Sequence, residues 1–122
     1  MEPDSPQLLN AQAALLERSG SFDKSIALMK QIVERFPHYA MTRINLARAA
    51  MNTRRLDEAH EWLDPVLSAE RLTSVEFCFL CAAKIDLCAL EENFTAARMW
   101  FDMWARFAPE DPKLEWYKSQ LW

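Results

Sequence analysis

Glycine is almost absent from this chain of 122 residues, which contains a single one. Tight turns between β-strands depend on glycine, asparagine and aspartate, because several turn types require a positive φ. Clusters of these residues are missing between the apolar segments, so the sequence argues against a β-sheet protein. A hydrophobic content of 51% excludes a disordered chain. The length fits one domain with a substantial core.

Positive charge is also scarce, since 14 lysine and arginine residues face 18 acidic ones and the net charge is −4. A nucleic-acid surface needs a basic stripe, so we expect no nucleic-acid partner. A membrane-spanning helix needs about 18 or more consecutive apolar residues. The nearest candidate, Val75–Leu90, is interrupted by Glu76, Lys84 and Asp86. We therefore expect no contact with a membrane.

Cysteine occurs three times, an odd number that does not make an extracellular disulfide framework. The first residues, MEPDSPQLLN, also lack the basic and apolar regions of a signal peptide, so we expect a cytoplasmic protein. Cys78, Cys81 and Cys88 have the spacing of a metal or redox cluster. Zinc usually takes four ligands, however, and His38 and His60 lie in other segments. We predict that the cysteines fill core positions and that no metal or cofactor is bound.

Residues arranged for catalysis are missing as well. Neither His38 nor His60 has a serine or cysteine nearby in a triad-like pattern. A phosphate-binding loop needs several glycines. The acidic pairs lie near predicted helix ends, where the helix dipole or solvation explains them. We predict that the protein is not an enzyme.

Apolar residues recur near every 3.6 positions along the whole chain, which is the pattern of amphipathic helices. Start and stop signals divide this pattern into about seven helices with short connections. In chain order, these signals are Ser5-Pro6, Gly20-Ser21, Phe36-Pro37, Asn52-Thr53, the capping box Thr73–Glu76, Asn93 and Asp111-Pro112.

One spacing occurs three times, with a small residue three positions after an apolar one and a large apolar residue four positions further on. The three copies are Gly20-x-Phe22-x-x-Ser25 with Met29, Arg54-x-Leu56-x-x-Ala59 with Leu63, and Glu92-x-Phe94-x-x-Ala97 with Phe101. The small residues let two helices approach closely. A large residue there would overpack the contact at a cost of about 1–3 kcal/mol.

This pattern resembles the tetratricopeptide repeat, whose 34-residue unit carries W-x2-L-G-x2-Y, then A-x3-F, then P. The resemblance implies an all-α fold, a right-handed α-solenoid of three helical hairpins with a C-terminal capping helix. Stacked hairpins bury the apolar faces that one hairpin leaves exposed. The implied single domain spans residues 1–122, with repeats at about 5–38, 39–72 and 73–110 and the capping helix at 112–121. The third leading helix has four additional residues, about one turn, whose position the sequence leaves open.

In this family the leading helices line a concave surface that holds peptides or partner segments. The resemblance therefore implies a protein–protein interaction module, either an adaptor or scaffold or a chaperone-like protein. Small bacterial secretion chaperones with three such repeats fit the count, although no residue singles them out. Carried over position by position, the ligand groove consists of Met41, Ile44, Asn45, Arg48, Phe79, Ala82 and Asp86.

Asn45 matches an asparagine that bonds the ligand backbone in the family. Arg48 either forms an ion pair with Asp86 or binds an acidic partner. Met41 and Phe79 also fit a packing role between neighbouring leading helices, and this alternative stays open. Family members that clamp the carboxylate of heat-shock chaperones use lysine, arginine and asparagine at five positions. Those positions here hold Asn10, Ala14, Asn45, Phe79 and Ala83, and only Asn45 fits.

Five tryptophans are many for this length. Trp104 takes a position held by smaller residues in the earlier repeats, which predicts contact with the last helix. Trp116 and Trp122 point partly away from the face that Leu114, Tyr117 and Leu121 share. Exposed tryptophans often mark an interface. A homo-oligomer through the C-terminal helix, or a fragment of a longer solenoid, is therefore the alternative function.

Overall fold

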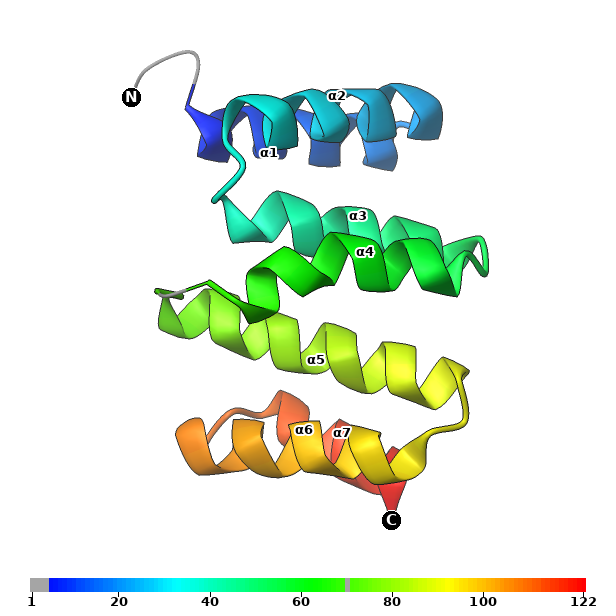
Figure 1. The fold of residues 1–122 in the computed structure, drawn as a ribbon, viewed down its shortest axis with the longest axis vertical. Helices are drawn as coiled ribbons and strands as arrows, with labels where there is room; N and C mark the ends of the chain where they lie inside the picture. The colour runs from blue at the N-terminus through cyan, green and yellow to red at the C-terminus, as the bar shows by residue number, and fades with distance from the viewer. Residues whose placement is uncertain (1–4, 70) are drawn as a thin grey trace. The chain divides into compact units, whose positions relative to one another are not determined.

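A computed structural model describes residues 5–69 and 71–122. Helices are the only regular secondary structure in these residues, which confirms the predicted all-α fold of seven helices (Figure 1). In chain order they are α1 (Pro6–Arg18), α2 (Phe22–Arg35), α3 (Ala40–Asn52), α4 (Leu56–Leu67), α5 (Ser74–Leu90), α6 (Phe94–Phe107) and α7 (Lys113–Leu121). None of these described helices is both long and apolar enough to cross a membrane.

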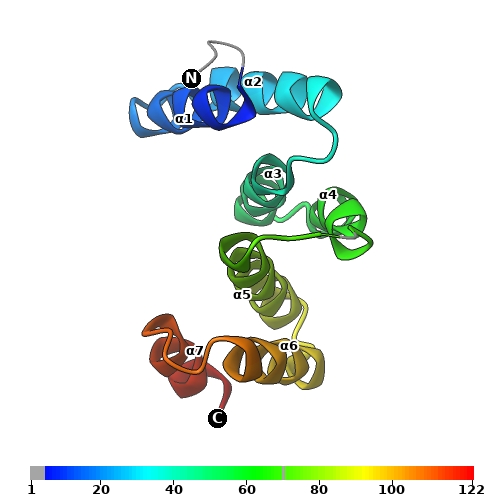
Figure 2. The ribbon, with the colours of Figure 1, turned by 90° about the vertical axis from the view of Figure 1, so that its left-hand side faces the viewer.

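The helices form two compact parts, an N-terminal part (residues 5–69) and a C-terminal part (residues 71–122). In the N-terminal part, α1 pairs with α2 and α3 pairs with α4, and α2 also packs on α3. In the C-terminal part, α5 pairs with α6, and α7 packs on α6 (Figures 1 and 2). Each part is thus built from the helical hairpins that the repeat predicts.

Three helices begin with a side-chain N-cap at the position that the sequence predicts. The Ser5 hydroxyl accepts a 3.2 Å hydrogen bond from the N–H of Leu8, the third residue of α1. Thr73 and Glu76 form the reciprocal capping box of α5, with bonds of 3.1 and 2.8 Å. Asn93 caps α6 in the same way as Ser5. These bonds satisfy N–H groups that have no partner within a helix.

Each hairpin turn contains a residue with positive φ at the equivalent repeat position. The φ values are +85° at Gly20, +61° at Arg54 and +60° at Glu92. Each lies two residues after the end of its leading helix. Glycine adopts this conformation readily, whereas another residue holds it at a cost of about 1–2 kcal/mol. The single glycine therefore marks the first of three equivalent turns.

The additional turn of the third repeat lies at the start of α5. This helix has 17 residues, whereas α1 and α3 have 13 each. All three end at the same distance from their turn residue, so the extra length extends the N-terminal end, over residues 74–77. The sequence had left this position open.

Small residues bring the helices of each hairpin together, as predicted. Ala59 and Ala97 are fully buried. Ser25 is 2% exposed, and its hydroxyl donates a 2.8 Å hydrogen bond to the Ala13 carbonyl across the first hairpin. A larger side chain at Ser25 would force α1 and α2 apart.

Each part has its own apolar core. In the N-terminal part, buried Ala13, Met29, Val33 and Leu46 form a cluster with the partly buried Trp62 against it. In the C-terminal part, the core joins α5 and α6 to Leu114 and Leu121 of α7. The buried Trp104 lies 5.4 Å from the ring of Tyr117, which confirms its predicted contact with the last helix.

Candidate functional site

The predicted groove residues of α3 lie at different depths. Met41, Asn45 and Arg48 are half-buried. Ile44 is 0% exposed, so it supports this face from beneath and is not accessible to a ligand in this structure. The difference arises because Ile44 is one residue from Asn45, about 100° around the helix.

Two leading helices of the N-terminal part are joined by side chains on this face. The side-chain oxygen Oδ1 of Asn10 accepts hydrogen bonds from the Thr42 hydroxyl at 3.1 Å and from the side-chain amide of Asn45 at 3.4 Å. These bonds tie α1 to α3 and orient Asn45. The sequence predicts that Asn10 and Asn45 lie on equivalent faces of their helices. It does not predict the hydrogen bond between them or the second hydrogen bond from Thr42. The signal that could have indicated the bond is the separation of Asn10 and Asn45, which is close to one repeat length.

The predicted groove residues of α5 also differ in their surroundings. Phe79 is half-buried, and Ala82 is 6% exposed. The Asp86 carboxylate accepts a 3.1 Å hydrogen bond from the Tyr117 hydroxyl of α7. The ion pair between Arg48 and Asp86 stays a prediction.

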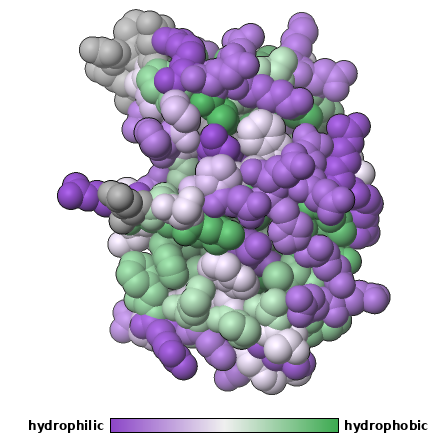
Figure 3. Space-filling model, in the orientation of Figure 1, coloured by the Kyte–Doolittle hydropathy of each residue, from purple (hydrophilic) through white to green (hydrophobic). Residues whose placement is uncertain are grey.

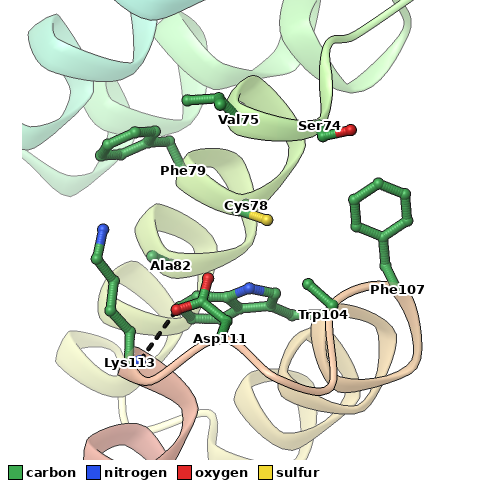
Figure 4. Close-up of a pocket in the computed structure, with 10 residues that line it drawn as sticks. Ser74, Val75, Cys78, Phe79, Ala82, Trp104, Phe107, Asp111 and Lys113 are labelled. Carbon is green, nitrogen blue, oxygen red and sulfur yellow. Dashed lines mark hydrogen bonds between the residues drawn. The ribbon is translucent and has the colours of Figure 1, made fainter.

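Phe79 and Ala82 line a pocket within the C-terminal part, here called the α5–α7 pocket. Its volume is about 270 Å³, and it lies between the start of α5, the end of α6 and the connection to α7 (Figure 4). The sequence did not predict this pocket. Its ten lining residues are Ser74, Val75, Cys78, Phe79, Ala82, Trp104, Phe107, Ala108, Asp111 and Lys113.

The walls of the α5–α7 pocket are apolar, and its few polar groups occupy defined places. The Lys113 ammonium lies 4.7 Å from the centre of the Phe79 ring, a cation–π contact at the mouth. The Asp111 carboxylate accepts a 3.0 Å hydrogen bond from the Lys113 backbone N–H at the start of α7. The indole N–H of Trp104 is buried and has no nitrogen or oxygen acceptor among the described residues.

All three cysteines have thiols that resist ionisation. Burial raises the pKa of Cys78, and the Asp111 carboxylate raises this pKa further, against weaker opposing effects of the Trp104 N–H and Lys113. Burial also raises the pKa of Cys81 to about 12 and that of Cys88 in the same direction. Cys81 and Cys88 are buried core residues, as predicted, whereas Cys78 is partly exposed in the pocket. Within the described residues, no cluster of three or more histidine, cysteine or acidic side chains is placed to hold a metal ion.

Further apolar side chains are exposed on α6 and on α7. Trp116 and Trp122 are 59% and 61% exposed, and Met99 and Met103 of α6 are exposed beside polar residues. Pale and green side chains gather over α6 in Figure 3. Trp122 is partly held in place, because its ring lies 5.0 Å from that of Phe101.

The chain was compared with known proteins. Residues 16–74 match the sequence model of the tetratricopeptide repeat family. A search of curated proteins finds no match. The matched segment contains α2, α3 and α4 together with the turns at Gly20 and Arg54, which carry the repeated spacing. This match supports an assignment of the chain to the tetratricopeptide repeat family.

Proposed function

We propose that this protein is an adaptor or chaperone-like module that binds a peptide or a partner helix on its leading helices. Repeats of this family generally mediate protein–protein interaction and form a non-catalytic fold. The proposal includes a single domain of three hairpins over residues 1–122, a cytoplasmic location and no nucleic-acid partner. The net charge of −4 and the free cysteines support the last two points.

The observation that carries this proposal is the orientation of Asn45 by Asn10. Its bond to Asn10 uses one donor of the Asn45 amide. An asparagine side chain has two donor hydrogens and an acceptor oxygen, so Asn45 retains groups for a ligand backbone. A side chain that is already held in place loses less entropy when a ligand binds.

Two further residues of α3 lie on the same helix face as Asn45. Met41 precedes Asn45 by four positions and Arg48 follows it by three, and residues at these spacings are neighbours on a helix. The flexible thioether of Met41 adapts to apolar side chains of different shapes. The guanidinium of Arg48 supplies charge-assisted hydrogen bonds to an acidic partner.

The double change Asn45→Ala/Arg48→Glu is expected to weaken partner binding by about 2 kcal/mol or more, roughly 30-fold. The partner is captured from lysate of the source organism with the wild-type protein and identified by mass spectrometry. Its dissociation constant is then measured by calorimetry for both proteins.

The matched control is Gln31→Ala/Lys30→Glu, which makes the same kinds of change at two exposed residues of α2. Binding that survives in the control and is lost in the α3 variant supports the proposal. Equal affinities for all three proteins would move the binding site away from α3.

Self-association is the second candidate function, because Trp116 and Trp122 expose more than half of their surface. We expect light scattering to show dimers as the concentration rises, and Trp116→Ala to return the chain to a monomer. Phe22→Ala, which removes a similarly exposed ring from α2, serves as the control. A wild-type protein that stays monomeric at high concentration would rule this function out.

A further inference from the structure

The size of the α5–α7 pocket fits one large side chain. Pockets for drug-sized ligands typically measure about 300–1,000 Å³, and this one is smaller, at about 270 Å³. Val75 and Phe107 are 60% and 52% exposed at its mouth, so apolar surface faces water when the pocket is empty. An entering apolar group would remove that surface from water, which is the main source of favourable free energy at interface hot spots.

One buried polar group in the pocket lacks a strong acceptor. The Trp104 side chain is 0% exposed, and within the described residues its N–H has no nitrogen or oxygen acceptor and faces only the weakly accepting Cys78 thiol. In Figure 4 the indole nitrogen lies on the side of the ring that faces α5, near the sulfur of Cys78. Thiol sulfur is a weak acceptor, and a buried donor without a partner is costly. An oxygen atom that took the place of the thiol would be a stronger acceptor for this donor.

The mouth of the pocket carries a positive charge. The Lys113 side chain is exposed and extends over the Phe79 ring (Figure 4). Asp111, its acidic neighbour, is engaged with the backbone of α7. An acidic side chain that approaches Phe79 from solvent would therefore meet the Lys113 ammonium.

We propose that the α5–α7 pocket is an anchor site for a protein partner. It takes one large apolar side chain from an acidic segment, whose backbone carbonyl accepts the Trp104 N–H. A peptide residue supplies both groups in one piece, the apolar side chain for the walls and the carbonyl for the donor. This inference rests on the proposed function, since it requires a protein partner, but it uses neither Asn45 nor Arg48.

The test is NMR of the full chain labelled with ¹⁵N, in which each tryptophan indole N–H gives its own signal. The probe is N-acetyl-phenylalanine methylamide at millimolar concentration, and the alanine analogue is its control. The phenylalanine probe is expected to shift the Trp104 signal downfield and to slow labelling of Cys78 by a thiol reagent. Trp62 should not respond, because its N–H already donates to Glu58. Toluene, which has no oxygen, should not reproduce the downfield shift of the Trp104 signal.

Further variants test the apolar lining of the α5–α7 pocket and the positive charge of Lys113. Phe107→Ala is expected to lower the affinity for the phenylalanine probe at least about fivefold. Phe94→Ala, at the other end of α6 and similarly exposed, should leave this affinity unchanged. A Phe-Glu probe should bind up to about fivefold tighter than Phe-Lys at low salt, and Lys113→Met should remove this difference.

A Trp104 signal that the probe does not move, in a protein whose other signals show it folded, would overturn the anchor site. So would an equal downfield shift with toluene, or equal weakening by Phe107→Ala and Phe94→Ala. Because the probes need no natural partner, a failure here leaves the Asn45 and Arg48 experiment intact. A failure of that capture experiment likewise leaves the probe result standing.

Discussion

Replacing Trp104 by alanine is expected to lower the free energy of unfolding by about 3–5 kcal/mol. The side chain is 0% exposed and lies in the core that joins α5, α6 and α7. Its ring also packs edge-on to Tyr117 of α7. Alanine would leave a cavity that the surrounding helices fill only partly. Loss of the unpaired N–H offsets a fraction of this cost. Urea denaturation of the full chain, followed by circular dichroism, gives the value.

Trp116→Ala is the matched control for this change, since it removes the same ring from a side chain that is 59% exposed. Surface substitutions usually change stability by less than about 0.5 kcal/mol. Equal losses for the two variants would mean that Trp104 does not hold α7 in place.

Replacing Leu63 by alanine should destabilise the N-terminal part by about 2–5 kcal/mol. Leu63 is the large apolar residue of the second repeat, and it is fully buried. It lies one turn after the small residue Ala59, where α3 and α4 approach each other. A cavity at this point loses contacts with both helices. The expected result is a lower midpoint in thermal and urea denaturation.

The control for Leu63 is Leu67→Ala, one turn further along α4, where the side chain is 41% exposed. It removes the same atoms from a site that water reaches already, so a loss below about 1 kcal/mol is expected. Equal stability of the Leu63 and Leu67 variants would contradict the prediction that the large apolar residue of the second repeat stabilises the core.

Helix boundaries were predictable because their signals are local. The caps at Ser5, Thr73 and Asn93 each bond an N–H three residues away, so the sequence contains both partners within one turn. The hairpin turns were equally predictable, since 34 residues separate Gly20 from Arg54 and 38 residues, one repeat plus the additional turn, separate Arg54 from Glu92.

The site was less predictable because it depends on distant residues. Cys78 and Lys113 line one pocket although 35 positions separate them, and helical periodicity does not indicate where α7 returns to the core. The buried state of Ile44 shows the same limit. Periodicity identifies the face of a helix, whereas burial at the edge of that face depends on the neighbouring helices.

The extra turn at the start of α5 has a consequence for the repeat array. It contributes Ser74 and Val75 to the pocket, and its Phe77 ring lies 4.9 Å from that of Phe107. Four residues make nearly one full turn, so an insertion of this length leaves every later residue of the helix facing almost the same way. The hairpin turn at Glu92 and the contact at Ala97 are thereby preserved. Lengthening one helix by a turn is thus a way to add a pocket to a repeat array without repacking the core it already has.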